Sequence, residues 1–178
     1  ARLSFEEASE LAYYGAEVLH PATMVPALQH GVPIRVLHTF DPEAPGTLIL
    51  PKGETGPDCP VKSIVYKEDQ VLINVRSERM LGMEGFMARL FAVFERVGIV
   101  IDMISTSEVS VSLTTDCTDQ KKLDALVSDL GKLARVEIQK EKCIVAIVGE
   151  GMKHTIGLAA RTFSAVAKAQ VSLQMISQ

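Results

Sequence analysis

Apolar positions recur with the period of a helix near the start of the chain. Ser4 and Glu7 have the spacing of a capping box, in which each side chain hydrogen-bonds the backbone of the other residue. The apolar residues beside this box lie one, three or four positions apart: Phe5, Ala8, Leu11 and Ala12. The pattern predicts a helix that begins after Ser4 and closes at Gly15.

A second short helix is expected to begin at His20 and to end at Gly31. His20 precedes a proline, which favours a structural role at the helix entry over a catalytic one. Two strands are expected next, over residues 33–40 and 47–50, with a turn rich in proline and glycine between them. Residues 1–50 are therefore predicted to be the closing elements of an α/β domain.

The pattern changes after residue 50. Residues 51–68 begin with a stretch of prolines and glycines that has almost no apolar content, and they are predicted to be a linker. Residues 69–140 then follow the order strand, helix, strand, strand, helix, strand. The strands are expected at 71–75, 99–104, 109–115 and 135–140, and the helices at 86–97 and 123–133. This order predicts a ferredoxin-like antiparallel sheet with both helices on one face.

The chain also repeats itself at an offset of 72 residues. Residues 71–106 align with residues 143–178 without a gap, which indicates an internal duplication. The identical pairs are Glu78 with Glu150, Met80 with Met152, Gly85 with Gly157, Ala88 with Ala160, Arg89 with Arg161, Phe91 with Phe163, and Met103-Ile104-Ser105 with Met175-Ile176-Ser177. The second copy, residues 141–178, stops after its second predicted strand. It is predicted to be incomplete, with an edge that another segment or chain must cover.

Composition narrows the class of protein. The 178 residues are 47% hydrophobic and carry a net charge of −4, which excludes a disordered tail and argues against a nucleic-acid partner. No apolar stretch approaches the roughly 20 residues that a bilayer requires, so no membrane association is expected. The three cysteines have no CxxC spacing, which predicts reduced thiols and no metal site.

No catalytic residue is predicted. The four histidines show no HExxH spacing, and no GxSxG motif is present. Gly149 and Gly151 resemble the start of a phosphate-binding loop, but His154 stands where the third glycine belongs, so a turn is favoured. The predicted strands 99–104 and 109–115 contain no aromatic residue, which argues against RNA binding on the sheet.

The loop before the first helix of residues 69–140 is the candidate binding site. Gly85 stands immediately before that helix, where free backbone N–H groups and the helix dipole can hold a carboxylate. The expected strand with Val100, Ile101 and Asp102 offers backbone partners and one carboxylate for an ammonium group. A zwitterionic amino acid fits such a pair of poles. The alternative is that Gly85 is only a turn glycine and Asp102 a solubilising residue, and the residues alone favour neither interpretation.

Three motifs resemble those of the aspartate kinases, which phosphorylate the side-chain carboxylate of aspartate with ATP. The motifs are YGAEVLHP, the DPEAPGT turn, and ISTSEVSVSL after a glycine-led helix. The resemblance covers nearly the whole chain. It implies an α+β fold: the last α/β elements of an amino-acid kinase domain in residues 1–50, then tandem ferredoxin-like βαββαβ modules of the ACT type with antiparallel sheets. The first module is residues 69–140, and the incomplete second is residues 141–178.

The resemblance also implies an effector site in the first module. In lysine-inhibited members, the effector lies against residues that correspond here to Met80, Leu81, Gly82, Gly85, Phe86, Met87, Val100, Ile101, Asp102, Thr106, Ser107 and Glu108. Two acidic groups, Asp102 and Glu108, suit an effector with two ammonium groups, which favours L-lysine over threonine. Threonine, S-adenosylmethionine and a ligand-free assembly or dimerisation module remain the alternatives.

The same resemblance implies what the chain lacks. Some members carry lysine beside the nucleotide where this chain has Glu17, so Glu17 and Val18 are minor candidates for nucleotide binding. ATP with Mg²⁺ is expected to serve the parent enzyme, whereas this stretch is expected to bind no cofactor and to be inactive alone. The second module is expected to support dimerisation and interdomain contact. A homodimer in the cytoplasm, or in the plastid stroma of a plant-type source, is the implied setting.

Overall fold

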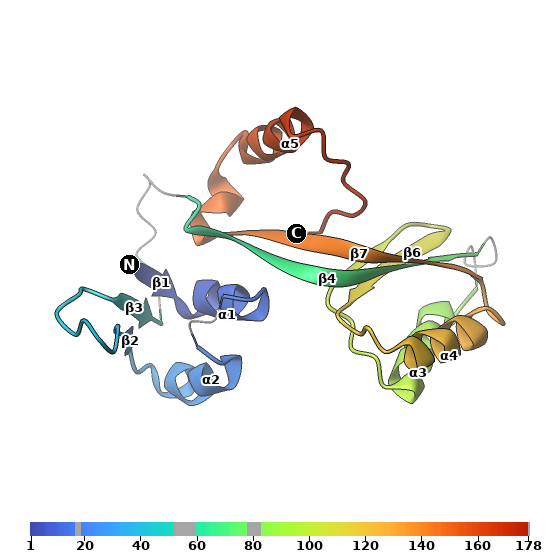
Figure 1. Ribbon diagram of the computed structural model, residues 1–178, viewed down its shortest axis with the longest axis horizontal. Coiled ribbons are helices and arrows are strands. Elements are labelled where there is room, and N and C mark those ends of the chain that lie inside the picture. The colour runs from blue at the N-terminus through green and yellow to red at the C-terminus, as the bar shows by residue number, and fades with distance from the viewer. Residues whose placement is uncertain (17–18, 52–59, 78–82, 178) are drawn as a thin grey trace. The chain divides into compact units, whose positions relative to one another are not determined.

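The computed structural model describes residues 1–16, 19–51, 60–77 and 83–177 (Figure 1). Its internal contacts divide the chain into two compact units, and each unit is considered by itself. The first unit contains Ala1–Lys67 and Ile144–Val171, and the second contains Glu68–Cys143 and Ser172–Gln178. Each unit therefore joins segments that are far apart in the sequence.

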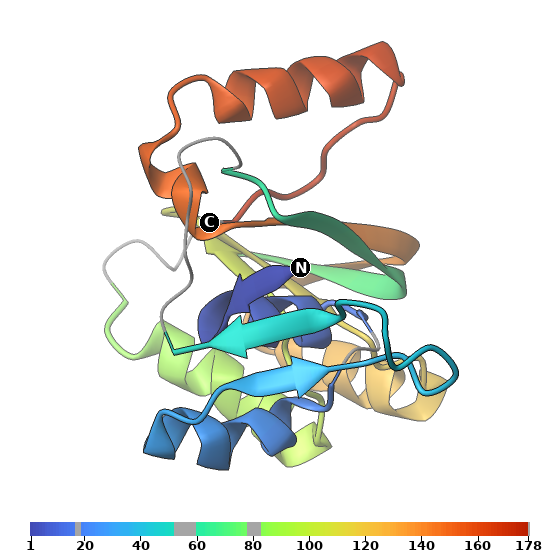
Figure 2. The ribbon, with the colours of Figure 1, turned by 90° about the vertical axis from the view of Figure 1, so that its left-hand side faces the viewer.

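The first unit begins with a small sheet and two helices (Figure 2). Its elements are β1 (Arg2–Ser4), α1 (Phe5–Tyr13), α2 (Pro21–His30), β2 (Ile34–Val36) and β3 (Thr47–Leu50). The strand order is β1-β3-β2, with β1 parallel and β2 antiparallel to β3. The strand expected over residues 33–40 is shorter than predicted, because only three of its residues pair with β3 and an isolated bridge joins His38 to Asp41.

Both helix starts have the predicted caps. Glu7 donates its backbone N–H to Ser4 Oγ at 3.0 Å, and the Glu7 carboxylate accepts the Ser4 N–H at 3.0 Å, so the capping box is confirmed. His20 Nδ1 accepts the Ala22 N–H at 3.2 Å, and Gly31 closes α2 with a φ of 63°. His20 is therefore a cap, which confirms its structural role.

The core of the first unit includes the end of a strand from late in the chain. Buried side chains from β1, α1, α2 and β3 pack with Val148 of β7 (Arg135–Val148), while Val65 of β4 (Ser63–Arg76) and Ala146 pack partly buried against them. The buried members are Leu3, Phe5, Ala8, Leu11, Met24, Ile49 and Val148. Segments separated by about a hundred residues thus share one apolar cluster.

The second unit has the predicted ferredoxin-like topology. Between β4 and β7 lie α3 (Phe86–Val97), β5 (Ile104–Thr106), β6 (Ser110–Thr115) and α4 (Gln120–Leu130). The strand order is β5-β6-β4-β7, and β6 is antiparallel to both β4 and β5. The strand expected at 99–104 is wrong in position, since only Ile104–Thr106 pair with β6. Strands β4 and β7 are longer than predicted, and β4 includes the last residues of the expected linker.

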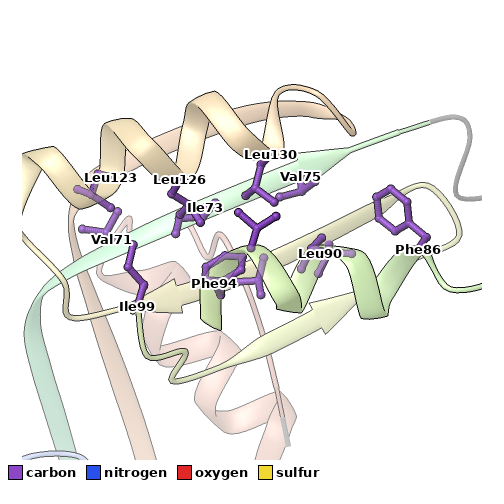
Figure 3. Close-up of a cluster of buried hydrophobic side chains, with 13 residues drawn as sticks. Val71, Ile73, Val75, Phe86, Leu90, Phe94, Ile99, Leu123, Leu126 and Leu130 are labelled. Atoms are coloured by element: carbon purple, nitrogen blue, oxygen red, sulfur yellow. The ribbon is translucent and has the colours of Figure 1, made fainter. Parts of the chain in front are cut away.

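Helices α3 and α4 pack side chains against alternate residues of the strands (Figure 3). The strand side chains are Val71, Ile73, Val75, Val111 and Leu113, and the helices contribute Phe86, Leu90, Val93, Phe94, Leu123, Leu126 and Leu130. Period 2 in the strands and period 3.6 in the helices place all of them on facing surfaces. Among the described residues, no helix is long and apolar enough to cross a membrane.

An ion pair joins the exposed sides of these two helices. Arg96 of α3 donates to a carboxylate oxygen of Asp129 of α4 at 2.8 Å, and Lys132 donates to the other oxygen at 2.6 Å. The hydrogen bonds from Lys132 and then Arg96 lower the pKa of Asp129 below its usual value. Because these charged side chains are largely exposed, their ion pairs contribute little to stability.

The second copy of the repeat reproduces the helix geometry of the first. Gly85 before α3 and Gly157 before α5 (Leu158–Lys168) have φ values of 72° and 82°. Gly98 and Gln170 follow these helices with φ values of 69° and 55°. A short 3₁₀ helix, η2 (Glu150–His154), precedes α5, and the described residues 171–177 form no strand. The backbone thus supports the duplication.

Both long strands contain a residue in the left-handed region. Asp69 in β4 has a φ of 56°, and Glu141 in β7 has a φ of 57°. Each lies within three residues of the boundary between the two units. A side chain in this conformation costs about 1–2 kcal/mol. The strands are therefore strained where they pass from one unit to the other.

We expect Glu141→Gly to preserve or raise the free energy of unfolding, because glycine adopts this φ without the side-chain cost. The matched change Glu137→Gly, at an exposed position of the same strand, should lower it by about 1 kcal/mol through lost backbone order. Chemical denaturation of both variants measures the difference. A greater loss for Glu141→Gly than for Glu137→Gly would contradict the strain.

Candidate functional site

The start of α3 offers backbone donors for an anionic group. Gly85 is its N-cap and provides no side-chain hydrogen bond, and the first turn contains no acidic residue. Phe86 is 4% exposed and packs in the core of the second unit, with Met87 partly buried beside it. These contacts fix the helix start, and its dipole favours a carboxylate there.

Arg89 adds a positive charge at this helix start. Its Nη2 donates to the carbonyl oxygen of Glu84 at 3.3 Å, so the guanidinium folds back toward the residue before Gly85. Arg89 is not among the site residues predicted from the sequence. The sequence offered one indication, because Arg161 occupies the equivalent position in the second copy. In both copies the arginine N–H donates to the carbonyl oxygen of the glycine before the helix at 3.1 Å.

Residues 100–103, which follow α3, lie beside β6 but do not form a strand. Val100 is 70% exposed, whereas Ile101 packs against the core. Asp102 is half-buried, and its N–H donates to the carbonyl of Thr114 at 2.8 Å. The next N–H, of Met103, donates to Thr114 Oγ1 at 3.0 Å. Thr114 therefore holds the Asp102 segment in place with both of its oxygens.

The third group of candidate residues forms the turn between β5 and β6. Thr106, Ser107 and Glu108 are all exposed. Ser107 donates its N–H to the Ser110 carbonyl at 2.8 Å, and Ser107 Oγ accepts the Ser110 N–H at 3.1 Å. These bonds make a tight turn that presents Glu108 to solvent.

The β4–β6 register separates the turn from Asp102. Arg76 pairs with Ser110 at the turn, whereas Leu72 pairs with Thr114, the residue that holds Asp102. Four strand residues span about 13 Å, at roughly 3.3 Å per residue. Within one chain, the turn and the Asp102 segment therefore lie toward different ends of the sheet.

The turn lies beside the end of β4. Ser77, immediately after β4, donates its N–H to the Val109 carbonyl at 2.9 Å. The chain continues from Ser77 into the loop before Gly85. Thr106, Ser107 and Glu108 are thus next to the beginning of the predicted effector loop.

Some predicted site residues lie outside the described part of the chain. They are the loop residues Met80, Leu81 and Gly82 and the nucleotide candidates Glu17 and Val18. The residues on either side of Glu17 and Val18, Ala16 and Leu19, pack against the core of the first unit. Among the described residues, no group of three or more histidine, cysteine, aspartate or glutamate side chains could hold a metal ion.

Comparisons with known proteins identify the family. The ACT domain family matches residues 73–123 and 145–178. Aspartokinase 1, chloroplastic, of Arabidopsis thaliana is 40% identical over 99% of this chain and 32% of its own length. A putative C-terminal regulatory domain of aspartate kinase from Porphyromonas gingivalis is 35% identical, with 66% of this chain covering 78% of that one at a TM-score of 0.55. The chain belongs to the aspartokinase family.

One further similar structure contains a ligand. E. coli aspartokinase III in complex with lysine and aspartate is 35% identical, and 99% of this chain covers 40% of it at a TM-score of 0.80. This aspartokinase chain thus spans about a third of the length of its Arabidopsis relative and corresponds to the regulatory ACT region of the family. The predicted family and α+β fold are confirmed.

We expect Thr114→Val to loosen the Asp102 segment. Thr114 is 5% exposed, and valine keeps its shape but leaves the Met103 N–H without its acceptor, which costs about 1–3 kcal/mol. The free energy of unfolding should fall by that amount, and the Met103 amide should exchange faster. The control Thr118→Val, at an exposed position, should change neither. Equal behaviour of the two variants would show that Thr114 does not hold the segment.

Proposed function

We propose that this chain is a lysine-sensing regulatory region. In the whole protein it would adjust the transfer of phosphate from ATP to the side-chain carboxylate of aspartate. The observation that carries the proposal is the uncapped start of α3, with Arg89 folded against it and two further carboxylates, Asp102 and Glu108, on the same module. The E. coli aspartokinase III structure named as a complex with lysine supports the choice of effector.

Each charged group of lysine has a chemically matched partner in this proposal. The α-carboxylate binds the N–H groups at the start of α3, where the dipole and Arg89 both favour negative charge. The two ammonium groups bind Asp102 and Glu108. Threonine has a single ammonium group and could bind only one of these two carboxylates, which is why lysine is favoured.

Two copies of the chain are needed to bring these groups together. The turn with Glu108 and the segment with Asp102 lie about 13 Å apart along the sheet. One lysine molecule is shorter than this separation. We therefore propose a homodimer in which the loop, helix start and turn of one copy face the Asp102 segment of the other.

Inhibition follows from different affinities for two states. An effector shifts an equilibrium only to the extent that it binds one arrangement more tightly than the other. Lysine that joins two first modules would favour the arrangement in which the modules are paired. ATP and Mg²⁺ are proposed substrates of the whole protein, and no step is assigned here to Glu17 or Val18.

We expect Asp102→Asn to weaken lysine binding by about tenfold or more, since it removes a charged hydrogen-bond partner. The matched change Asp124→Asn, on the exposed side of α4, removes the same charge outside the predicted site and should leave the affinity within about twofold. Calorimetric titration measures both, with threonine and S-adenosylmethionine as alternative ligands.

Three results would overturn the proposal. Tighter binding of threonine or S-adenosylmethionine than of lysine would reassign the effector. Equal loss in Asp102→Asn and Asp124→Asn would remove Asp102 from the site. The absence of heat with every ligand, in a chain that still forms dimers, would favour an assembly module without a ligand.

A further inference from the structure

Glu7 has a second role beyond its capping box. Its side chain is 2% exposed, and one carboxylate oxygen, Oε2, accepts the N–H of Ser4 at 3.0 Å. The other oxygen, Oε1, accepts the backbone N–H of Glu150 at 2.9 Å. Glu150 is the first residue of η2, 143 positions further along the chain. One buried carboxylate thus joins α1 to the loop that precedes α5.

The apolar surroundings of Glu7 make the loss of this hydrogen bond costly. Burying a carboxylate is costly unless hydrogen bonds compensate for the lost water. Phe5, next to Ser4, and Val148, two positions before Glu150, both lie in the apolar core of the first unit. If the loop moved away, Glu7 Oε1 would lose its donor in a place that water reaches poorly. The bond therefore favours one defined position of the loop against α1.

The same loop is closely packed on its other side. A Cβ atom at Gly149 would lie 2.1 Å from the carbonyl oxygen of Pro60, and one at Gly151 would lie 2.9 Å from Pro60 Cα. Lys62 donates its N–H to the Val148 carbonyl at 2.8 Å. Only glycine allows this approach. The loop is fixed between the residues around Pro60 and α1.

The corresponding loop of the first copy differs in sequence at both glycine positions. At the offset of 72 residues, Gly149 and Gly151 correspond to Ser77 and Arg79, whose side chains could not fit against a backbone in this way. The first-copy loop, which begins at Ser77, is the proposed effector loop. The duplication has therefore produced one loop suited to a ligand and one packed against the chain's own backbone.

We propose that the second-copy loop is a docking site for α1 and that Glu7 is the positioning residue that transmits the effector signal to it. This inference rests on the proposed function for its ligand. Strands β4 and β7 each contribute residues to both units, so the chain is continuous from the lysine site to the loop. A shift of these strands would reach α1 through the bond from Glu150 to Glu7.

Two pairs of variants in the 178-residue chain isolate the bond. Glu7→Gln retains the size of the side chain but directs an amide toward one of the two N–H donors, while Glu6→Gln makes the same charge change at the exposed neighbour. Glu150→Pro deletes the donating N–H together with the side chain at the first position of η2, where proline fits a helix start. Glu150→Ala removes the side chain and retains the N–H.

Amide hydrogen exchange read by NMR, with and without lysine, tests the proposal, and calorimetry reports lysine affinity. In Glu7→Gln, the Glu150 amide should exchange about tenfold faster without lysine. Lysine should still bind within about twofold of the unsubstituted affinity, but its effect on exchange in α1 should disappear in Glu7→Gln and in Glu150→Pro. The Glu6→Gln and Glu150→Ala variants should retain that effect.

The outcomes separate the two proposals. If the unsubstituted chain binds no lysine, the proposed function fails. The docking role is then judged from the Glu150 amide in Glu7→Gln: unchanged exchange overturns that role, and faster exchange supports it. If lysine binds and still alters exchange in α1 of Glu7→Gln, the signalling role is overturned while the proposed function stands. A tenfold loss of lysine affinity in Glu7→Gln would also overturn the signalling role, because Glu7 would then affect the lysine site itself.

Discussion

The apolar face of β4 is the constraint on which the first ACT module depends. Val71, Ile73 and Val75 are at most 2% exposed and lie against α3 and α4. A slip of one residue would turn all three toward the other face, so the register with β6 is firmly set. That register positions the turn of residues 106–108 beside the end of β4 and holds Asp102 about 13 Å away, next to Thr114. The geometry of the proposed effector site therefore depends on the packing of the core.

Local signals made the helices and the strand order predictable. The capping box of Ser4 and Glu7 and the glycines that end the helices depend on neighbours in sequence, and the structure has them as expected. The strand at 99–104 failed because Ile99 and Ile101 pack on the core as side chains without entering the ladder. Apolar alternation indicates which side chains are buried, and it does not show which backbone groups pair.

The contacts that relate to function were harder to infer. Arg89 folds onto Glu84 through a carbonyl, and Glu7 accepts the N–H of Glu150. Outside local capping patterns, a bond to a backbone group has no signature in a sequence, so neither contact could be anticipated from residue types. The duplication gave a partial guide, since it located two equivalent loops. The sequence shows that the two loops differ at Gly149 and Gly151, and the reason for these glycines is their close packing against Pro60.

Lysine, in the function proposed above, binds between two first modules and stabilises their pairing. Sedimentation equilibrium of the chain, with and without saturating lysine, measures that pairing. Because a ligand that binds only the paired state must strengthen pairing, we expect a lower dissociation constant for the dimer in lysine and no change in threonine. A dimer dissociation constant that is the same in lysine, in threonine and in buffer would show that lysine does not bind between two first modules.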